Sequence, residues 1–283
     1  MNAWQWPAYG KINLSLDVLA RRPDGYHELS SVMQSIHLAD ELVFRPNTSG
    51  AINFSCSDPA LAGEDNLVVK AARLLKERFG LNAGVDIHLV KKLPVAAGLG
   101  GGSSDAAVTL KALNHLWGLE LPLSHLVALG RELGADVPFA LVGGTALAQG
   151  IGERITILPP VPRLWLVLVK PAVGLRAGEV YRRWDEGRYR SGEFTAGVLK
   201  ALERGDRKEL LQALGNDLER VVQALVPEVA VIMRELAEAG VAKALVSGSG
   251  PTVLGFVESE TQAAALCREL SRKYPEVYYT HTI

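Results

Sequence analysis

Alternating apolar and polar residues predict strands at two places in the N-terminal part of the chain. From Lys11 to Val18 the sequence KINLSLDV alternates strictly, with an aliphatic residue at every second position. Because successive side chains of a strand point to opposite faces, we expect a half-buried strand with one polar face. Val85, Ile87 and Leu89 repeat the pattern and predict another strand, which leads into a segment rich in glycine.

Apolar residues at helical spacing predict helices on both sides of that glycine-rich segment. Before it, residues 65–79 carry leucine and alanine at helical spacing, and Gly80 supplies a stop signal. After it, a single helical stripe is formed by Ala106, Leu110, Leu113 and Trp117. The predicted order is therefore strand, glycine-rich loop, helix.

A further helix is expected to begin at Ser124, as its N-cap, and to end at Gly134. Asp136 then lies just past the end of this helix, in the sequence GADVP. Pro138 suits the first turn of a following helix, so Asp136 is also a candidate for capping it.

The sequence LPPVPR at residues 158–163 contains three prolines and marks a boundary. We therefore expect an N-terminal domain of residues 1–160 and a C-terminal domain of residues 161–283. In the second domain the predicted strands are residues 164–169, 243–250, 252–258 and 276–282, and the predicted helical stretches are residues 197–225 and 260–274. Strands and helices mixed in both halves favour an α+β fold.

Composition restricts the class of protein. The 283 residues include 30 Lys or Arg and 31 Asp or Glu, a net charge of −1 that does not favour a nucleic-acid partner. The longest apolar run, residues 164–169, is far shorter than the roughly 20 residues of a membrane-spanning helix. With no secretion-type N-terminus, we expect a cytoplasmic protein without a membrane partner. Cys56 and Cys267 lack metal-ligand spacing and are expected to be reduced thiols.

The sequence LPVAAGLGGGSSDAA at residues 93–107 is the strongest candidate for binding chemistry. A helix start exposes unpaired N–H groups and the positive end of the helix dipole, and glycine lets the backbone approach an anion. A flexible turn is the simpler interpretation, but it needs fewer small and hydroxyl residues. The segment predicts a polyphosphate-binding loop made of Pro94, Gly98, Leu99, Gly100, Gly101, Gly102, Ser103 and Ser104.

Two common phosphate-binding loops fit this segment less well. A P-loop requires GxxxxGK[ST], whereas the nearest lysine after the glycines is Lys111, inside the predicted helix. A dinucleotide-binding fingerprint would be followed about 20 residues later by an acidic residue at a strand end. This chain has GLELPL there, so that interpretation lacks support as well.

Three stretches together resemble the motifs of the galactokinase, homoserine kinase, mevalonate kinase and phosphomevalonate kinase superfamily, the GHMP kinases. The loop resembles their pattern PxxxGLGSSAA, and YGKINLSLDV near the N-terminus and VSGSGPTVLGF at residues 246–256 agree with it. The three stretches occur in the expected order along the chain. The resemblance implies a two-domain α+β fold with the active site in the interdomain cleft, and it implies ATP and Mg²⁺ as cofactors.

A narrower resemblance points to the acceptor. RRPDGYHELSSVMQSI at residues 21–36, the additional glycine in GLGGGSSDAA, and LGADVPF at residues 133–139 are similar to one group of GHMP kinases. That group phosphorylates the 2-hydroxyl of 4-diphosphocytidyl-2-C-methyl-D-erythritol in non-mevalonate isoprenoid biosynthesis, and DGYHE is its most specific stretch. The resemblance implies this small molecule as the substrate.

The resemblance assigns catalysis to Lys11 and Asp136. It implies that Lys11 lies beside the acceptor hydroxyl and keeps Asp136 ionised, and that Asp136 acts as the base. Whether Asp136 removes the proton or only orients the hydroxyl stays open. Asn13 shares a strand face with Lys11, so its amide can reach the same ligand. Without the resemblance, a solvated lysine and a capping aspartate are the ordinary interpretations.

The resemblance also assigns ligand contacts. In the family, the tyrosine and histidine that match Tyr26 and His27 stack on cytosine and hydrogen-bond to it. Tyr181, in GEVYRRW, falls where the family often has an aromatic residue on the opposite side of the base. Asn66 matches a residue that contacts adenine, although it is equally a candidate helix cap. Since Asp24-Gly25 is a turn signal, the bland alternative for Tyr26 and His27 is a pair of exposed hairpin residues.

Other functions predict other observations. A GHMP kinase that acts on homoserine or mevalonate would share the loop but has no need of DGYHE. A nicotinamide oxidoreductase would bind NAD in place of ATP. A non-catalytic nucleotide-binding protein would be expected to lack Lys11 or Asp136, and both are present. The sequence identifies neither the metal ligands nor the oligomeric state.

Overall fold

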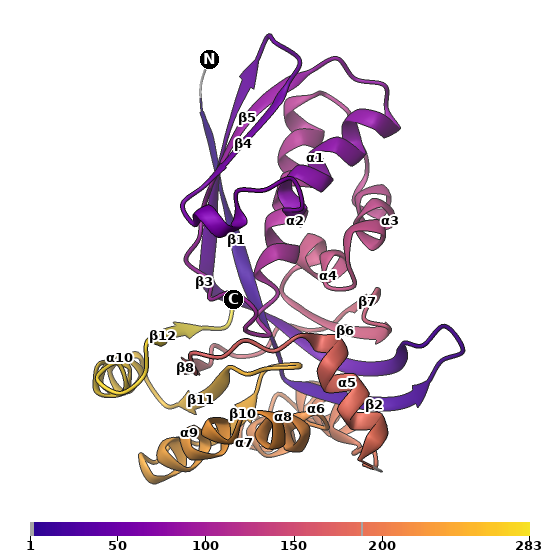
Figure 1. The fold of residues 1–283 in the computed structure, drawn as a ribbon. Coiled ribbons are helices and arrows are strands. Elements are labelled where there is room, and N and C mark those ends of the chain that lie inside the picture. The colour runs from indigo at the N-terminus through magenta and orange to yellow at the C-terminus, as the bar shows by residue number, and fades with distance from the viewer. Residues whose placement is uncertain (1–2, 188) are drawn as a thin grey trace. The chain divides into compact units, whose positions relative to one another are not determined.

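The computed structural model describes residues 3–187 and 189–283. They form two compact units, each assembled from separate stretches of sequence (Figure 1). Unit 1 combines the segment up to Gly10 with Ala39–Leu93 and Gly100–Gly143, and unit 2 combines Lys11–Leu38, Pro94–Leu99 and Gly144–Ile283. A single cut near residue 160 does not describe these units, and the expected division into domains at that point stays a prediction.

Unit 1 packs helices against one side of a group of strands (Figure 1). Strand β4 (Ile52–Cys56) runs parallel to β5 (Gly84–Val90), and β5 pairs antiparallel with the second half of β3 (His27–Asn47). The pairing partners of β3 also include β1 (Trp4–Asn13). The helical elements are η1 (Pro59–Leu61), α1 (Leu67–Arg78), α2 (Gly101–Leu116), α3 (Leu123–Leu133) and α4 (Val137–Val142).

The core of unit 1 confirms the local sequence patterns. The alternating residues of β5 are all buried, and they join Leu42 and Phe44 of β3 in one apolar cluster. The stripe predicted on α2 contributes Ala106, Leu110 and Leu113 to the same cluster. Burial of these side chains removes apolar surface from water, which is the main force that holds the helices on the strands.

Unit 2 contains a four-stranded antiparallel sheet in the order β10-β11-β8-β12. Its strands are β8 (Trp165–Lys170), β10 (Lys243–Val246), β11 (Val253–Val257) and β12 (Glu276–His281). The other strands are β2 (Ser15–Arg21), the first half of β3, β6 (Thr145–Gly150), β7 (Arg154–Ile157) and β9 (Gly215–Asn216). The mixed α+β composition expected from the sequence is confirmed.

The helices of unit 2 follow the predicted helical stretches, and the structure adds one helix before these stretches and one between them. They are α5 (Ala177–Glu186), α6 (Phe194–Arg204), α7 (Arg207–Ala213), α8 (Glu219–Leu225), α9 (Pro227–Glu238) and α10 (Glu260–Leu270). Val221, Val222 and Leu236 are among the buried side chains that helices supply to the core of this unit, together with Val169 and Val253 from the sheet.

The expectation for residues 11–18 was wrong in two respects. Strand β1 ends at Asn13 and β2 begins at Ser15, so the stretch is not one strand. Its polar face is buried, because the polar side chains find partners there. Asn13 Nδ2 donates to Ser31 Oγ at 2.8 Å, and Asp17 Oδ2 accepts from the backbone N–H of Thr195 at 2.9 Å. Buried polar groups are tolerated where they are hydrogen-bonded in this way.

Two capping predictions also differ from the structure. Helix α3 begins at Leu123 with Pro122 at its N-cap, so Ser124 lies inside the first turn and does not cap it. Gly134 ends this helix as expected. Asp136 occupies the N-cap position of α4, but its side chain accepts no capping hydrogen bond and its backbone is already in the helical region, with φ −84° and ψ −11°.

Candidate functional site

The glycine-rich segment changes from loop to helix at Gly101, where α2 begins. Gly100 is the N-cap residue with φ 67°, a left-handed conformation that favours glycine. Gly100 makes no side-chain capping hydrogen bond to this end of α2, and the backbone N–H of Ser104 donates to the carbonyl of Gly100 at 2.9 Å. The N–H groups that precede Ser104 have no partner within the helix, which is the arrangement that suits an anion at a helix start.

The first part of the loop packs within unit 2. The carbonyl of Leu99 accepts from the backbone N–H of Lys11 at 2.9 Å, and the carbonyl of Gly98 accepts from Ser247 Oγ at 3.1 Å. A Cβ at position 98 would lie 2.2 Å from the carbonyl oxygen of Ser247, and Gly98 has φ 77°. This position therefore needs glycine for both conformation and space. Pro94 belongs to the same loop.

The second part of the loop packs within unit 1. Ser104 is buried and its Oγ donates to the carbonyl of Tyr9 at 2.6 Å, so that hydroxyl is already used in the fold. Ser103 lies beside the segment that leads to Asp136, since a Cβ at Gly134 would be 3.9 Å from Ser103 Oγ. A Cβ at Gly102 would contact Leu67, the first residue of α1. The start of α2 thus adjoins both the first residue of α1 and the loop before Asp136.

Lys11 and Asn13 form a buried polar pair in unit 2. Lys11 is only 6% exposed, and its Nζ donates to Asn13 Oδ1 at 3.0 Å. A Cβ at Gly248 would lie 3.0 Å from Asn13 Oδ1 and 3.5 Å from Lys11 Nζ. The lysine is therefore not a solvated surface residue, and it meets the SGSGP segment as well as Asn13.

His27 is buried and contacts two residues of α5, whereas its neighbour Tyr26 is 60% exposed. His27 Nε2 lies 2.7 Å from Asp185 Oδ1, and the His27 and Tyr181 rings are stacked with centroids 5.1 Å apart. The sequence missed Asp185. The only signal was its position four residues after Tyr181, which places both side chains on one face of a helix.

Asn66 caps α1, as its alternative interpretation stated. Its Oδ1 accepts from Val68 N–H at 2.9 Å and its Nδ2 donates to the carbonyl of Leu61 at 2.8 Å. The contact of Asn66 with adenine stays a prediction, since both polar atoms of the side chain have local partners in this structure.

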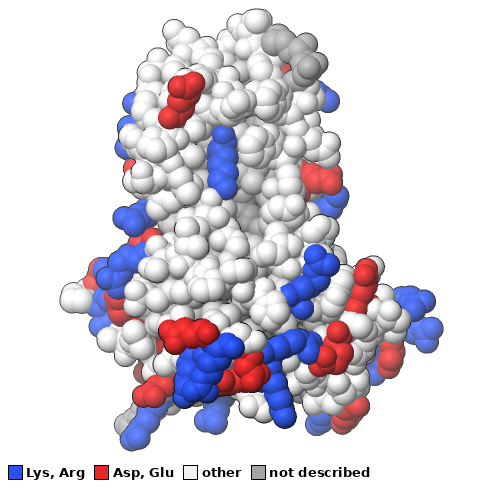
Figure 2. All heavy atoms as spheres, turned by 180° about the vertical axis from the view of Figure 1, so that it is seen from behind, with Lys and Arg blue, Asp and Glu red and all other residues white. Residues whose placement is uncertain are grey.

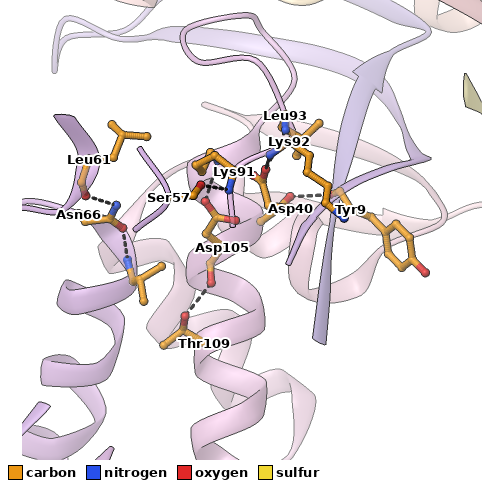
Figure 3. A network of polar contacts seen from close by, with 12 residues as sticks. Tyr9, Asp40, Ser57, Leu61, Asn66, Lys91, Lys92, Leu93, Asp105 and Thr109 are labelled. Carbon is orange, nitrogen blue, oxygen red and sulfur yellow. Dashed lines mark hydrogen bonds and ion pairs between the residues drawn. The ribbon is translucent and has the colours of Figure 1, made fainter. Parts of the chain in front are cut away.

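A buried charged cluster beside the start of α2 was not anticipated. Lys91, the residue after β5, lies between Asp40 and Asp105, with hydrogen bonds to both carboxylates (Figure 3). Burial raises the pKa of Asp105 to about 7; Lys91 opposes this shift and Asp40 adds to it. Nothing in the sequence pattern links residues 40, 91 and 105. Asp105 belongs to the helix predicted after the glycines, but no predicted element includes Asp40, and Lys91 looks like an ordinary surface residue.

On one face of the molecule, the charged residues that the structure describes give no sign of a highly charged partner. Figure 2 shows basic and acidic side chains interspersed on the face in view, without a broad area of one sign among the described residues there.

Three other features of the described residues bear on the class of protein. Within residues 3–187 and 189–283, no group of three or more His, Cys, Asp or Glu is arranged to hold a metal ion. Cys56 and Cys267 are free thiols, as expected. The described helices include none with the length and apolar character needed to cross a membrane.

Comparison with known proteins places these features in a family. The model of the GHMP kinases N terminal domain matches residues 66–144, and the model of the GHMP kinases C terminal matches residues 198–276. The homoserine kinase from Cytophaga hutchinsonii has a similar fold, with a TM-score of 0.72 at 19% identity over 95% of this chain and 94% of that one. The chain belongs to the GHMP kinase family, as its motifs predicted.

Within this family the similarity is to one kind of kinase. The chain is 49% identical over 265 residues to the 4-diphosphocytidyl-2-C-methyl-D-erythritol kinase of Pelotomaculum thermopropionicum, covering 92% of each chain. It is 45% identical to the protein of that name from Moorella thermoacetica over 100% of both chains. A crystal structure of 4-(cytidine 5'-diphospho)-2C-methyl-D-erythritol kinase matches with a TM-score of 0.86 at 36% identity over 99% of both chains.

Proposed function

We propose that this chain transfers the γ-phosphate of ATP to the 2-hydroxyl of 4-diphosphocytidyl-2-C-methyl-D-erythritol, giving the 2-phosphate and ADP, in non-mevalonate isoprenoid biosynthesis. The observation that carries the proposal is the 45% identity, over the full length of both chains, to a kinase of that name. A homoserine kinase and a mevalonate kinase share the fold at only 19% and 18% identity. Identity this low does not support assigning their acceptor substrates to this chain. The cytoplasmic location expected from the sequence stays a prediction.

The donor phosphates are assigned to the glycine-rich loop. Backbone N–H groups at the uncapped start of α2 suit phosphate oxygens, and the helix dipole favours negative charge there. Ser103 supplies a hydroxyl donor, while Ser104 holds the helix to Tyr9. Mg²⁺ bound to nucleotide phosphates neutralises part of their charge in such reactions.

Lys11 and Asp136 are assigned to the transfer itself. Phosphoryl transfer needs positive charge near the equatorial oxygens and a group that orients the attacking hydroxyl. The Lys11 ammonium is buried and aligned by Asn13, so little side-chain freedom is lost when it binds an anion. Asp136 is not used as a helix cap, which supports its proposed role as base or orienting group for the 2-hydroxyl.

The acceptor base is assigned to Tyr26, His27 and Tyr181. The exposed Tyr26 ring offers a face for stacking, a contact that buries a large flat surface. Nδ1 of His27, the ring nitrogen that does not face Asp185, is assigned the hydrogen bond to the base. Tyr181 stacks on His27 in this structure, so its proposed contact with the base requires the ring to turn or the base to lie against its other face.

A coupled assay of ADP release tests the function. The parent protein is expected to turn over the cytidyl substrate with MgATP and to release no ADP with homoserine or mevalonate. Asp136→Ala is expected to lose about 100-fold or more in kcat, because it removes a positioned acid–base group. Asp65→Asn, a change at a fully exposed carboxylate, is the control and is expected to keep the parent rate. A parent without turnover would overturn the function, and an active Asp136→Ala would overturn the mechanism only.

A second pair of variants separates transfer from substrate binding. Lys11→Met is expected to lose mostly kcat, because its charge is needed most in the transition state. Tyr26→Ala is expected to raise mostly the KM for the cytidyl substrate, because stacking is equally present in the ground state. Steady-state kinetics with each substrate varied measures both, and the reverse pattern would show that the two roles are exchanged.

A further inference from the structure

The charged cluster of unit 1 lies directly against the first residue of α2. A Cβ at Gly101 would be 3.3 Å from Lys91 Nζ and 3.5 Å from Asp40 Oδ2. Asp105 belongs to the same helix, four residues later and therefore about 6 Å further along its axis. A change in the charge or position of this cluster therefore changes the electrostatic potential or the position of the N–H groups assigned to the nucleotide phosphates.

Asp40 and Lys91 connect this helix start to the end of β5. Asp40 is fully buried, and its Oδ1 accepts from the backbone N–H groups of Lys92 at 2.5 Å and Leu93 at 2.7 Å. Its other oxygen accepts from Lys91, which also donates to Asp105 Oδ2 at 3.0 Å. The lysine thus ties the chain entering the glycine-rich loop to the helix leaving it (Figure 3).

The cluster of Asp40, Lys91 and Asp105 has fewer hydrogen-bond donors than its two carboxylates can accept from. Two buried carboxylates share a single ammonium, so the cluster carries a net negative charge when both are ionised. Asp105 is 2% exposed, and its Oδ1 has no hydrogen-bond partner in the described structure. An unsatisfied buried carboxylate oxygen is costly, whereas a protonated oxygen can donate to the neighbouring carboxylate.

The titratable groups around Asp105 come from three other parts of unit 1. They are Asp40 on β3, Lys91 after β5 and Cys56 at the end of β4, on whose thiol the charge of Asp105 acts. Burial alone would lower the pKa of Lys91, but the charges of Asp105 and Asp40 outweigh it and raise that pKa. Lys91 therefore stays charged, and burial raises the pKa of Asp105 to about 7, within the range where a modest change in its surroundings alters its charge.

We propose that Asp105, Lys91 and Asp40 form a proton-dependent support for the first turn of α2, in which Asp105 takes up a proton when nucleotide phosphates bind there. The proton comes from solvent or buffer and adds to the Asp105 carboxylate, with no other bond formed or broken. A polyphosphate anion disfavours a second negative charge close by, so the neutral cluster binds it more tightly. Asp105 and Lys91 are positioning residues, since neither is assigned a contact with the nucleotide. The inference rests on the proposed function.

Asp105→Asn is the matched test, because the amide keeps the size of the side chain and imitates its neutral form. The measurement is the Kd of MgATP by isothermal titration calorimetry between about pH 6 and about pH 8.5. If phosphate binding raises the proton affinity of Asp105 by one pH unit, the parent Kd rises about tenfold across this range. The variant is expected to hold the Kd that the parent shows at low pH. Asp86→Asn, which removes a carboxylate on β5 that is held by Asn47 and Asn53, is expected to behave as the parent.

Proton uptake gives a second readout that needs no variant. Titrating the parent with preformed MgATP near pH 7.5, in buffers of different ionisation enthalpy, is expected to show a net uptake that Asp105→Asn lacks. Zero uptake by the parent, or the same pH dependence of Kd in the parent and Asp105→Asn, would overturn the inference and leave the kinase function standing. Failure of the parent to bind MgATP at any pH would overturn both.

Discussion

At the scale of single residues, the sharpest arrangement is the one around His27. The Asp185 carboxylate accepts a hydrogen bond from the N–H at Nε2 of His27, which leaves Nδ1 as the nitrogen available to a ligand. Tyr181 fixes the ring plane by stacking. Since both residues stand on α5, the helix holds the imidazole from two directions and sets which edge it presents.

Asp185→Asn tests this arrangement. Loss of a charge-assisted hydrogen bond of this kind costs about 1–2 kcal/mol, so the KM for the cytidyl substrate is expected to rise about tenfold. The kcat and the KM for ATP are expected to change less than about twofold, because the proposed role of His27 is in binding the acceptor base and not in transfer or ATP binding. Glu186→Gln, which removes the next carboxylate on the same helix, is the control. An unchanged KM for the cytidyl substrate in Asp185→Asn would mean that His27 does not need this partner.

At the scale of elements, the SGSGP segment and the loop before α2 are packed against each other. Gly98 and Gly248 both have positive φ angles, and Gly98 meets the Ser247 carbonyl at a distance that no side chain permits. Ser247 Oγ closes the contact by donating to Gly98 O at 3.1 Å. The glycines therefore serve close packing of two backbone segments within unit 2 as well as any approach to phosphate.

Comparing Gly98→Ala with Gly25→Ala separates the two reasons for glycine, which are the positive φ angle and the lack of space for a Cβ atom. Gly25 has φ 87° but open space around a Cβ, so alanine there is expected to cost only about 1 kcal/mol of backbone strain. Gly98→Ala adds a collision with backbone, and overpacking of this kind costs a further 1–3 kcal/mol, approximately. Urea unfolding measures the difference in free energy of unfolding. Equal losses in the two variants would show that the loop moves aside at little cost.

Elements with local patterns were predictable, and contacts between distant segments were not. The alternation of β5 and the stripe of α2 required only neighbouring residues, and both were found as expected. The burial of Asp17 depends on Thr195, far along the chain, so its strand face looked solvated. The cluster of Lys91, Asp40 and Asp105 likewise joins separate elements, and no motif marks it. Motif resemblance supplied Lys11 and Asp136, which no local pattern distinguishes from a surface lysine and a cap.

At the scale of the whole molecule, buried carboxylates are expected to make the stability of the fold decrease as the pH rises, the opposite of the usual effect of carboxylates. Burial raises the pKa of Asp105 to about 7, and burial also raises the pKa of Asp17 and of Glu219. A carboxyl group with a raised pKa holds its proton in the folded state when the unfolded chain has already lost it. Its contribution to stability is therefore complete below its unfolded pKa and is lost as the pH rises through its folded pKa.

The urea midpoint of the parent is therefore expected to fall between about pH 5 and about pH 8, with Asp105 responsible for most of the change near neutrality. Asp105→Asn cannot ionise, so it is expected to flatten the profile and to exceed the parent in stability at the upper end. Asp86 has a pKa lowered by hydrogen bonds from Asn53 and Asn47, so its contribution is lost only on the acid side. Asp86→Asn should consequently keep the slope of the parent near neutral pH. A parent midpoint that rises with pH over this range would show that Asp105 is ionised throughout, because only a carboxylate already charged in the fold escapes this loss.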